Sequence, residues 1–205
     1  MIDLHTHILP GCDDGAVDLE MALAMGRSAF HDGITTLAAT PHFYEIPRWS
    51  TVQQKVGELQ EEFVKAQIAV EVVAGAELLM DISLLDMERE EIPTYGDRGK
   101  YCLIELPALQ VPVYAEQVLF VLQTKGITPI IAHPERYGAV ARDPNVVLRW
   151  LQQGCLIQMN SGSILGRFGQ PIQETAQILL AQGMVQVVAS DGHGSGHRRI
   201  NLVEA

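Results

Sequence analysis

The sequence predicts an α/β protein with one domain, a distorted TIM-like barrel of seven βα units. Short, β-rich apolar runs alternate with longer amphipathic stretches, a pattern that indicates a parallel sheet with helical crossovers. The 205 residues suit a single domain with a sizeable core. Seven such units in a chain of this length favour a closed or nearly closed barrel. An open doubly wound sheet, which would carry a glycine-rich phosphate loop after its first strand, is the minor alternative.

Seven apolar runs rich in β-branched residues are expected to form the strands. They are Ile2–His5, Thr35–Thr40, Val70–Glu77, Tyr101–Leu106, Thr128–His133, Leu156–Asn160 and Val185–Asp191. Five stretches between them have the apolar spacing of a helix, and four of these are followed by a glycine that can end a helix. The expected helices are Leu19–His31, Val52–Ala66, Tyr114–Lys125, Val146–Gln153 and Ile172–Gln182.

The charge balance argues against a nucleic-acid surface. With 14 basic and 25 acidic residues, the formal net charge is −11, whereas a phosphate backbone requires clustered lysine and arginine. No apolar run reaches the roughly 18 residues of a membrane span. No basic segment precedes an apolar signal region, so we expect a cytoplasmic protein. The three cysteines are odd in number and widely spaced, which fits reduced thiols.

Polar side chains of the metal-binding type follow six of the seven expected strands. The first strand leads into His5-Thr-His7, in which the two imidazoles can point to the same face and hold one metal ion. Because the carboxyl ends of barrel strands share one mouth, all of these side chains should converge there. The other candidates are Asp14, after a short loop, and His42, Glu77, Glu105, His133, Asp191 and His193 at later strand ends.

The chemistry of these nine side chains indicates a centre with more than one metal ion. A buried charge without a partner costs several kcal/mol, and bound cations remove that cost. Five histidines with four carboxylates and no thiolate suit manganese, iron or zinc rather than copper. Nine ligands exceed the needs of one ion. The sequence therefore predicts two or three divalent ions.

Six short motifs occur along the chain in a characteristic order. They are His5-Thr-His7 with Asp13-Asp14-Gly, Thr40-Pro-His42, Gly-Ala-Glu77, Ile-Glu105, His133-Pro-Glu-Arg136-Tyr and Ser-Asp191-Gly-His193. This set resembles the polymerase-and-histidinol-phosphatase (PHP) superfamily. Within it, the Asp-Asp-Gly and His-Pro-Glu-Arg-Tyr motifs look most like those of the capsule-type, manganese-dependent bacterial protein tyrosine phosphatases. The resemblance covers residues 1–205 and implies one metallophosphatase domain that lacks a C-terminal helix found in the family.

The resemblance also implies a role for each candidate residue. A first ion would be held by His5, His7, Glu77 and Asp191. A second would be held by Glu77, Glu105 and His133, and a third by Asp14, His42 and His193. Asp14, rather than its neighbour Asp13, is the one expected to point inward. Arg136 and Arg198 would bind the phosphoryl oxygens.

The predicted function is hydrolysis of a phosphomonoester by a hydroxide that the metal ions generate. Arginine suits such a site because it binds phosphate through planar, bidentate hydrogen bonds. The resemblance implies that the substrate is phosphotyrosine in a bacterial tyrosine autokinase of exopolysaccharide or capsule synthesis. It implies manganese as the ion, with iron or zinc as alternatives.

Three other functions are open at this point. Histidinol phosphate is the alternative substrate within the superfamily. A nuclease-like phosphodiesterase is disfavoured by the acidic charge. A non-catalytic metal-binding scaffold would be expected to have lost ligands, whereas all nine positions and Arg136 are filled. Arg199, which stands where the family commonly has proline, is the alternative to Arg198 for binding phosphate.

Overall fold

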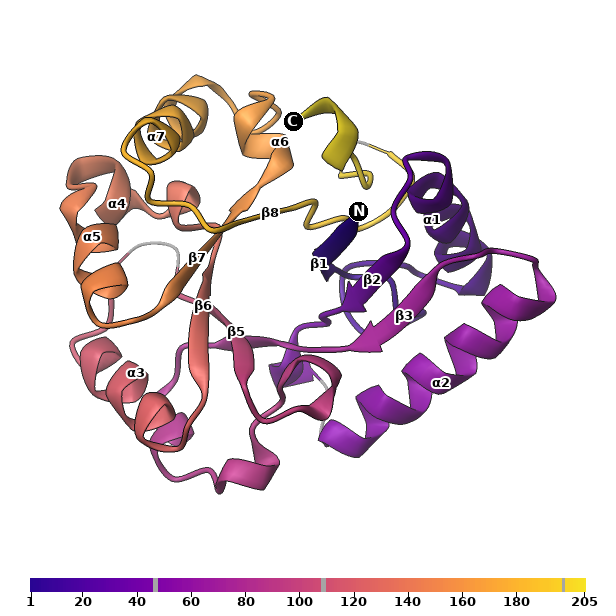
Figure 1. Cartoon of the computed structure of the whole chain (residues 1–205), viewed down its shortest axis with the longest axis horizontal. Helices are drawn as coiled ribbons and strands as arrows, with labels where there is room; N and C mark the ends of the chain where they lie inside the picture. The colour runs from indigo at the N-terminus through magenta and orange to yellow at the C-terminus, as the bar shows by residue number, and fades with distance from the viewer. Residues whose placement is uncertain (46–47, 108–109, 197) are drawn as a thin grey trace.

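Parallel strands lie at the centre of the molecule and helices lie on the outside (Figure 1). The computed structural model describes residues 1–45, 48–107, 110–196 and 198–205. The strands are β1 (Ile2–Thr6), β2 (Thr36–Ala39), β3 (Glu71–Ala74), β4 (Glu77–Leu79), β5 (Tyr101–Glu105), β6 (Thr128–Ala132), β7 (Leu156–Asn160) and β8 (Val187–Ala189). The helices are α1 (Leu19–His31), α2 (Trp49–Lys65), α3 (Ala115–Thr124), α4 (Gly138–Arg142), α5 (Asn145–Gln152), α6 (Ser161–Ile164) and α7 (Gln170–Ala181).

The strands form two parallel sheets that are joined at both ends. One sheet has the order β1-β2-β3 and the other the order β4-β5-β6-β7-β8. A parallel bridge between Thr6 and Gly192 connects β1 to the segment after β8. A second bridge, between His42 and Glu77, connects the segment after β2 to β4. The α/β class and the parallel arrangement are confirmed, and the bridged ring of strands is consistent with the expected distorted barrel.

The single strand predicted over Val70–Glu77 is wrong, because the chain forms two strands there. β3 pairs with β2 as far as Ala74, and β4 begins at Glu77 in the other sheet. Gly75 lies between them, and a Cβ at this position would be only 3.0 Å from the Thr40 side chain and 3.2 Å from the Tyr95 ring. The chain therefore crosses between the sheets at a point where only a glycine fits closely. Within the part of the chain that the structure describes, the break raises the number of strands from seven to eight.

The expected helices are present with modest shifts at their ends. α1 has the predicted bounds, and its N-cap Asp18 accepts a hydrogen bond from the backbone N–H of Met21. α2 begins three residues earlier than expected, and α4 and α6 are short helices that apolar spacing did not predict. α1 and α2 pack closely, since a Cβ at Gly26 would lie 2.4 Å from the Phe63 ring.

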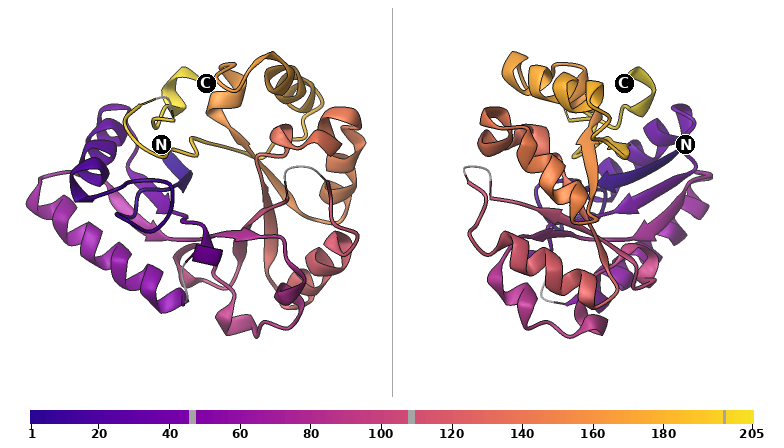
Figure 2. Two further views of the ribbon diagram at one scale, coloured as in Figure 1. Left: turned by 180° about the vertical axis from the view of Figure 1, so that it is seen from behind. Right: turned by 60° about the vertical axis from the view of Figure 1, so that its left-hand side comes forward.

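Two apolar clusters fill the space between the strands and the helices. One lies under α1 and α2 and contains Leu37 and Phe63. The other lies under α3, α5 and α7 and contains Ile104 and Trp150. Different views show the helices wrapped around the strands, with the two chain ends on the same side (Figure 2). Among the described residues, no helix is long and apolar enough to cross a membrane.

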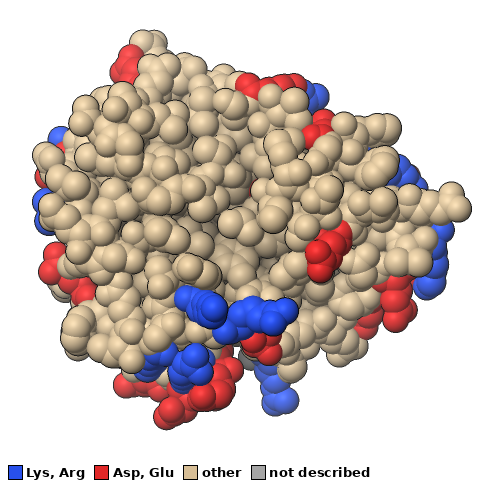
Figure 3. All heavy atoms as spheres, viewed as in Figure 1, with Lys and Arg blue, Asp and Glu red and all other residues tan. Residues whose placement is uncertain are grey.

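Charged side chains lie mainly at the periphery of the face drawn in Figure 3, and its centre is uncharged. Basic residues gather toward the lower edge, where acidic residues lie among them. This mixture differs from the continuous basic surface that a nucleic-acid backbone requires.

The closure of the ring depends in part on a buried carboxyl group, that of Asp3 on β1. Its Oδ1 accepts hydrogen bonds from the backbone N–H of Ser190 (3.0 Å) and of His5 (3.3 Å). Its Oδ2 is also buried and has no hydrogen-bond partner among the described residues. Burial raises the pKa of Asp3 from 3.8 to about 6, against the lowering effect of the Ser190 hydrogen bonds.

This pKa predicts how Asp3→Asn changes stability in metal-free protein. Between pH 3.8 and about 6 the folded chain holds the Asp3 proton more tightly than the unfolded chain, so this group's contribution to stability falls as pH rises. Asparagine cannot ionise. As the pH rises from 3.8 to about 6, the free energy of unfolding of the variant should therefore increase by about 3 kcal/mol relative to that of wild type, at about 1.4 kcal/mol per pKa unit. Denaturant unfolding at a series of pH values measures the difference in unfolding free energy between the variant and wild type. A difference that does not change with pH would contradict the prediction.

Candidate metal centre

His5 and His7 point their Nε2 atoms at each other at the carboxyl end of β1. Their Nε2 atoms are 3.2 Å apart, and both side chains are fully buried. His5 Nδ1 lies 3.0 Å from the amide oxygen of Gln158, which can only accept, so Nδ1 carries the proton. His7 Nδ1 lies 2.7 Å from the carboxylate of Asp13 and is protonated for the same reason. Each Nε2 is thereby left with a lone pair that requires a proton or a metal ion.

Two carboxylate oxygens complete a cage around these nitrogens. Glu77 Oε2 lies 3.4 Å from both Nε2 atoms, and Asp191 Oδ1 lies 3.5 Å from both. Four ligands at 2.0–2.1 Å from a tetrahedral ion would be separated by about 3.4 Å. The spacing of the two nitrogens from each other and from each carboxylate oxygen therefore fits a metal ion, and the chemistry of these atoms is that of borderline-hard ligands. His5, His7, Glu77 and Asp191 can hold one ion.

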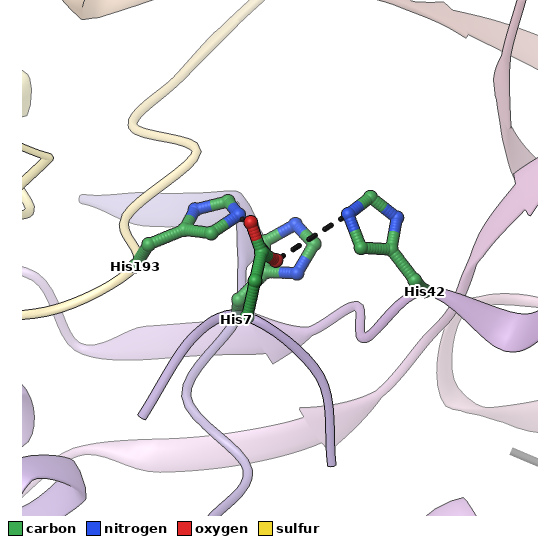
Figure 4. A group of neighbouring side chains, drawn as sticks. His7, His42 and His193 are labelled. Carbon is green, nitrogen blue, oxygen red and sulfur yellow. Dashed lines mark ion pairs between the residues drawn. The ribbon is translucent and has the colours of Figure 1, made fainter. Parts of the chain in front are cut away.

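A second group of side chains contains the imidazoles of His7, His42 and His193, which lie near one another (Figure 4). Asp14 Oδ1 lies 3.1 Å from His193 Nε2 and 3.5 Å from His42 Nε2. The imidazoles come from the segments after β1, β2 and β8, and the ring of His193 stacks on that of His7 at 3.8 Å. His7, Asp14, His42 and His193 together offer four ligand atoms within reach of one ion.

Glu77, Glu105 and His133 lie close together on neighbouring strands. His133 Nε2 lies 3.0 Å from Glu77 Oε1 and 3.8 Å from Glu105 Oε1. His42 also approaches, since its Nδ1 is 3.1 Å from Glu77 Oε2 and 3.9 Å from Glu105 Oε2. Glu77 thus touches both this group and the first cage, as expected of a residue that bridges two ions. His42 joins both outer groups, which the motif pattern did not indicate.

Two of the expected ligands occupy strained backbone conformations. His133 has φ of 31° and Asp191 has φ of 52°, in the left-handed region that residues other than glycine rarely adopt. Each such residue costs about 1–3 kcal/mol, which the surrounding structure must offset. At both positions the backbone turns sharply at the end of a strand. The turn keeps the side chain at the barrel mouth, and strain of this kind is typical of functional sites.

Asp191 presents its two oxygens to different partners. Oδ1 faces the His5–His7 cage, whereas Oδ2 accepts hydrogen bonds from Arg136 Nη1 (3.0 Å) and Arg198 Nη2 (3.0 Å). The two arginine side chains are 31% and 30% exposed, so they border both the centre and solvent. Arg199 instead pairs with Glu204 at 2.6 Å. Of the two neighbouring arginines, Arg198 is therefore the one that reaches the centre.

The expectation that only Asp14 points inward is wrong, because Asp13 is buried behind His7. Asp13 Oδ2 accepts from His7 Nδ1 and from the backbone N–H of His42 (3.0 Å), and its Oδ1 accepts from Gly15 N–H. Burial acts to raise the pKa of Asp13, but the hydrogen bond and charge of His7 lower it to about 2. The tight turn at Gly15 allows both carboxylates to face the centre, since a Cβ there would lie 2.1 Å from the His7 carbonyl oxygen.

Strand β7 contributes a pair of buried amides, which we call the amide ladder: Gln158 and Asn160. Gln158 Oε1 accepts from His5, and Gln158 Nε2 donates to Asn160 Oδ1 at 2.9 Å. Asn160 Nδ2 donates to Asp191 Oδ2 at 2.7 Å. The ladder thus orients two candidate ligands. The ladder was not predicted because Asn160 is not a typical ligand, although two polar residues at i and i+2 in a buried strand are a signal that the sequence contains.

Glu135 joins the ladder to the loop that carries His133 and Arg136. This fully buried carboxylate accepts from the backbone N–H of Asn160 (3.0 Å) and from the hydroxyl of Ser163 (2.6 Å). Burial raises its pKa. Because it fixes the short helix Pro134–Arg136 against β7, the arginine and the histidine keep their positions relative to Asp191.

The electrostatics of the centre favour charged carboxylates and protonated imidazoles when no cation is bound. Burial acts to raise the pKa of Glu77, but His5 and its other histidine neighbours hold it well below its usual range. Burial similarly opposes the charging of His7, whereas Asp13, Asp191 and Glu77 raise its pKa well above the ordinary value. His193 differs, since burial and the charge of His7 lower its pKa to about 4.

The structure brings all nine expected ligands and both expected arginines to one end of the barrel. The resulting groups are the cage of His5, His7, Glu77 and Asp191, the group of Glu77, Glu105, His133 and His42, and the group of His7, Asp14, His42 and His193. Their assignment to particular ions stays a prediction.

This chain is similar to proteins that are named as tyrosine-protein phosphatases. The tyrosine-protein phosphatase YwqE of Bacillus subtilis is 35% identical, over 100% of this chain and 82% of its own length. The tyrosine-protein phosphatase CpsB of Streptococcus pneumoniae is 31% identical, over 97% of this chain and 85% of its own.

Solved structures give the same picture of the fold. A crystal structure described as YwqE and CpsB, "unique metal-dependent tyrosine phosphatases", superposes with a TM-score of 0.93 at 35% identity, covering 98% of this chain and 82% of the other. A mutant of organophosphorus hydrolase from Deinococcus radiodurans, at 16% identity and a TM-score of 0.53, covers 94% of this chain and 75% of the other and shares only the fold. The family described as "Capsular polysaccharide synthesis, CpsB/CapC" matches residues 1–205. The chain belongs to the CpsB/CapC family.

Proposed function

We propose that this protein is a metal-dependent phosphatase that hydrolyses phosphotyrosine in proteins. The observation that carries the proposal is the arrangement around Asp191, which links the ligand cage through Oδ1 to two partly exposed arginines through Oδ2. A metal cage next to two guanidiniums suits a phosphoryl group, because both take up charge on its oxygens. The relatives named as tyrosine phosphatases support phosphotyrosine as the substrate.

The charges of the site support the binding of two or more divalent ions. The five carboxylates of Asp13, Asp14, Glu77, Glu105 and Asp191, against the two guanidiniums, leave a formal charge of −3 when the imidazoles are neutral. Two or three divalent ions make the net charge positive, which attracts the roughly −2 charge of a phosphate monoester. We propose manganese as the ion, with iron or zinc as alternatives, since the ligands are imidazoles and carboxylates without thiolate.

The residues of this chain would bind and orient the phosphoryl group. Arg136 and Arg198 can each form planar hydrogen bonds to phosphoryl oxygens, and their contact with Asp191 holds them at the edge of the cage beforehand. The bound ions would supply charge stabilisation and a water of lowered pKa as nucleophile. A phenolate with a pKa of about 10 is a better leaving group than an alkoxide and needs less protonation as it departs.

We also propose a partner and a location for the enzyme. Capsule synthesis in the family description supports a bacterial tyrosine autokinase of capsule or exopolysaccharide assembly as the phosphoprotein. We propose that the reaction takes place in the cytoplasm, where such a kinase domain would be accessible. We also propose that residues 1–205 form one catalytic domain.

Activity measurements with defined metals test the function. Protein stripped with a chelator should be inactive, and manganese should restore hydrolysis of a phosphotyrosine peptide. The restored kcat/KM for the peptide should exceed that for histidinol phosphate about tenfold or more, because binding groups for one substrate are left unpaired by the other. A preference for histidinol phosphate would instead identify the protein as a histidinol-phosphate phosphatase. Absence of activity on both, with metal bound, would favour a scaffold.

Two neighbouring arginines provide a matched pair of variants for this assay. Arg198→Lys keeps the charge but loses the planar pair of donors, so kcat/KM for the phosphotyrosine peptide should fall about 10- to 100-fold, the value of a charged hydrogen bond. Arg199→Lys, which alters a side chain paired with Glu204, should leave it nearly unchanged. An equal loss in both variants would contradict the placement of Arg198 at the phosphoryl group.

The amide ladder predicts an effect on metal affinity that is separate from turnover. Asn160→Ala removes the hydrogen bond to Asp191 and the acceptor for Gln158, so both ligands lose a constraint on their orientation. Manganese affinity should fall about 10- to 100-fold. Competition with a metal-binding dye measures it, and Gln177→Ala on the exposed face of α7 is the control. Unchanged affinity in Asn160→Ala would show that the ladder does not orient the ligands.

A further inference from the structure

An apolar pocket that the proposed chemistry does not use opens beside the metal centre. We call it the rim pocket; its apolar lining consists of Phe43, Tyr44, Leu78, Leu79, Leu84 and Met87. Its volume of about 390 Å³ is at the small end of the range for ligand pockets. A space of this size suits one or two side chains of a polypeptide better than a whole cofactor.

The rim pocket shares two of its walls with the centre. Leu79 lies two residues after Glu77 in β4, so the two side chains point to the same face of the strand. In the register between β4 and β5, Leu79 is also paired with Glu105. On the other side, the ring of Tyr44 stacks on that of His42 with centroids 5.2 Å apart. The pocket therefore lies directly beside the ligand groups.

The walls nearest the centre keep large side chains exposed to solvent. Tyr44 is 61% exposed and Leu79 is 36% exposed, although burying a side chain of this size would contribute about 1.5–3 kcal/mol. Leu84, deeper in the pocket, is buried and continues into the apolar cluster under α3. The pocket is thus a continuation of the core that remains open on the side of the active centre.

The geometry of a phosphotyrosine substrate specifies what can occupy this opening. When the phosphoryl group of an extended peptide enters the centre, the residues two positions away point to the same surface, about 6.7 Å along the chain. Tyr44 and Leu79 border the ligand groups, so they are the walls that one of these residues would reach. An apolar side chain at that position would cover both walls and remove them from water.

We propose that the rim pocket binds an apolar side chain of the substrate polypeptide, two residues from the phosphotyrosine. The inference rests on the proposed function and extends it, since it makes the protein selective for the sequence around the phosphorylated residue. Specificity of this kind comes from Leu79 and the pocket behind it, which lie outside the groups that touch the phosphoryl oxygens.

Binding of non-hydrolysable peptides to the manganese-loaded protein tests the inference. The peptides carry a phosphonate analogue of phosphotyrosine, with leucine or glutamine two residues before it or two residues after it. The leucine peptide of one of these pairs should bind about tenfold more tightly than its glutamine counterpart, in the range that burial of an apolar group provides. Leu79→Gln should abolish this difference.

Two controls separate the pocket from the chemistry. Leu180→Gln changes a leucine of similar exposure, 39%, on the distant helix α7, and should keep the preference for the leucine peptide. Hydrolysis of para-nitrophenyl phosphate, which has no peptide, should be the same in wild type and Leu79→Gln. Equal binding of the leucine and glutamine peptides in both pairs would overturn the inference while turnover persists. Loss of metal-dependent turnover in wild type would overturn the proposed function, and the inference with it.

Discussion

The rest of this structure depends on the burial of imidazole nitrogens and carboxylate oxygens at one end of the barrel. His5 and His7 have their Nδ1 protons committed to Gln158 and Asp13, so their Nε2 lone pairs face each other at 3.2 Å with Glu77 and Asp191 beside them. Without cations or protons such a cage would be strongly unfavourable. The need to place positive charge there explains both the ligand chemistry and the raised pKa of His7.

The surrounding fold offsets the cost of this cage in several places. The left-handed backbone of His133 and Asp191 is held by neighbours, including the buried Glu135 and the amide of Asn160. Asp191 also fixes two side chains outside the cage, because its Oδ2 accepts hydrogen bonds from Arg136 and Arg198. Orientation of the ligands and orientation of the phosphate-binding arginines are therefore two consequences of one hydrogen-bond network. The rim pocket lies just outside this network, where it can bind a substrate side chain without altering the cage.

Much of the centre could be predicted from the sequence, because parallel strands place their carboxyl ends together. The short motifs at these ends identified all nine convergent side chains, and α1 was predicted to the residue. Features that depend on close three-dimensional packing could not be found this way. The break at Gly75 follows from contacts with Thr40 and Tyr95 that lie far apart in the sequence. Likewise, the inward position of Asp13 follows from a loop turn that brings Gly15 against His7, and the choice of Arg198 over Arg199 from the pairing of Arg199 with Glu204.

The most direct test of this account is calorimetric titration of metal-free protein with manganese in two buffers of different ionisation enthalpy. Because His5, His7 and His42 have raised pKa values without metal, they carry protons that ligands must lose on binding. The account predicts two or three ions per chain, a net release of protons and an affinity that rises with pH. Binding of less than one ion per chain, or binding with no proton release, would contradict it.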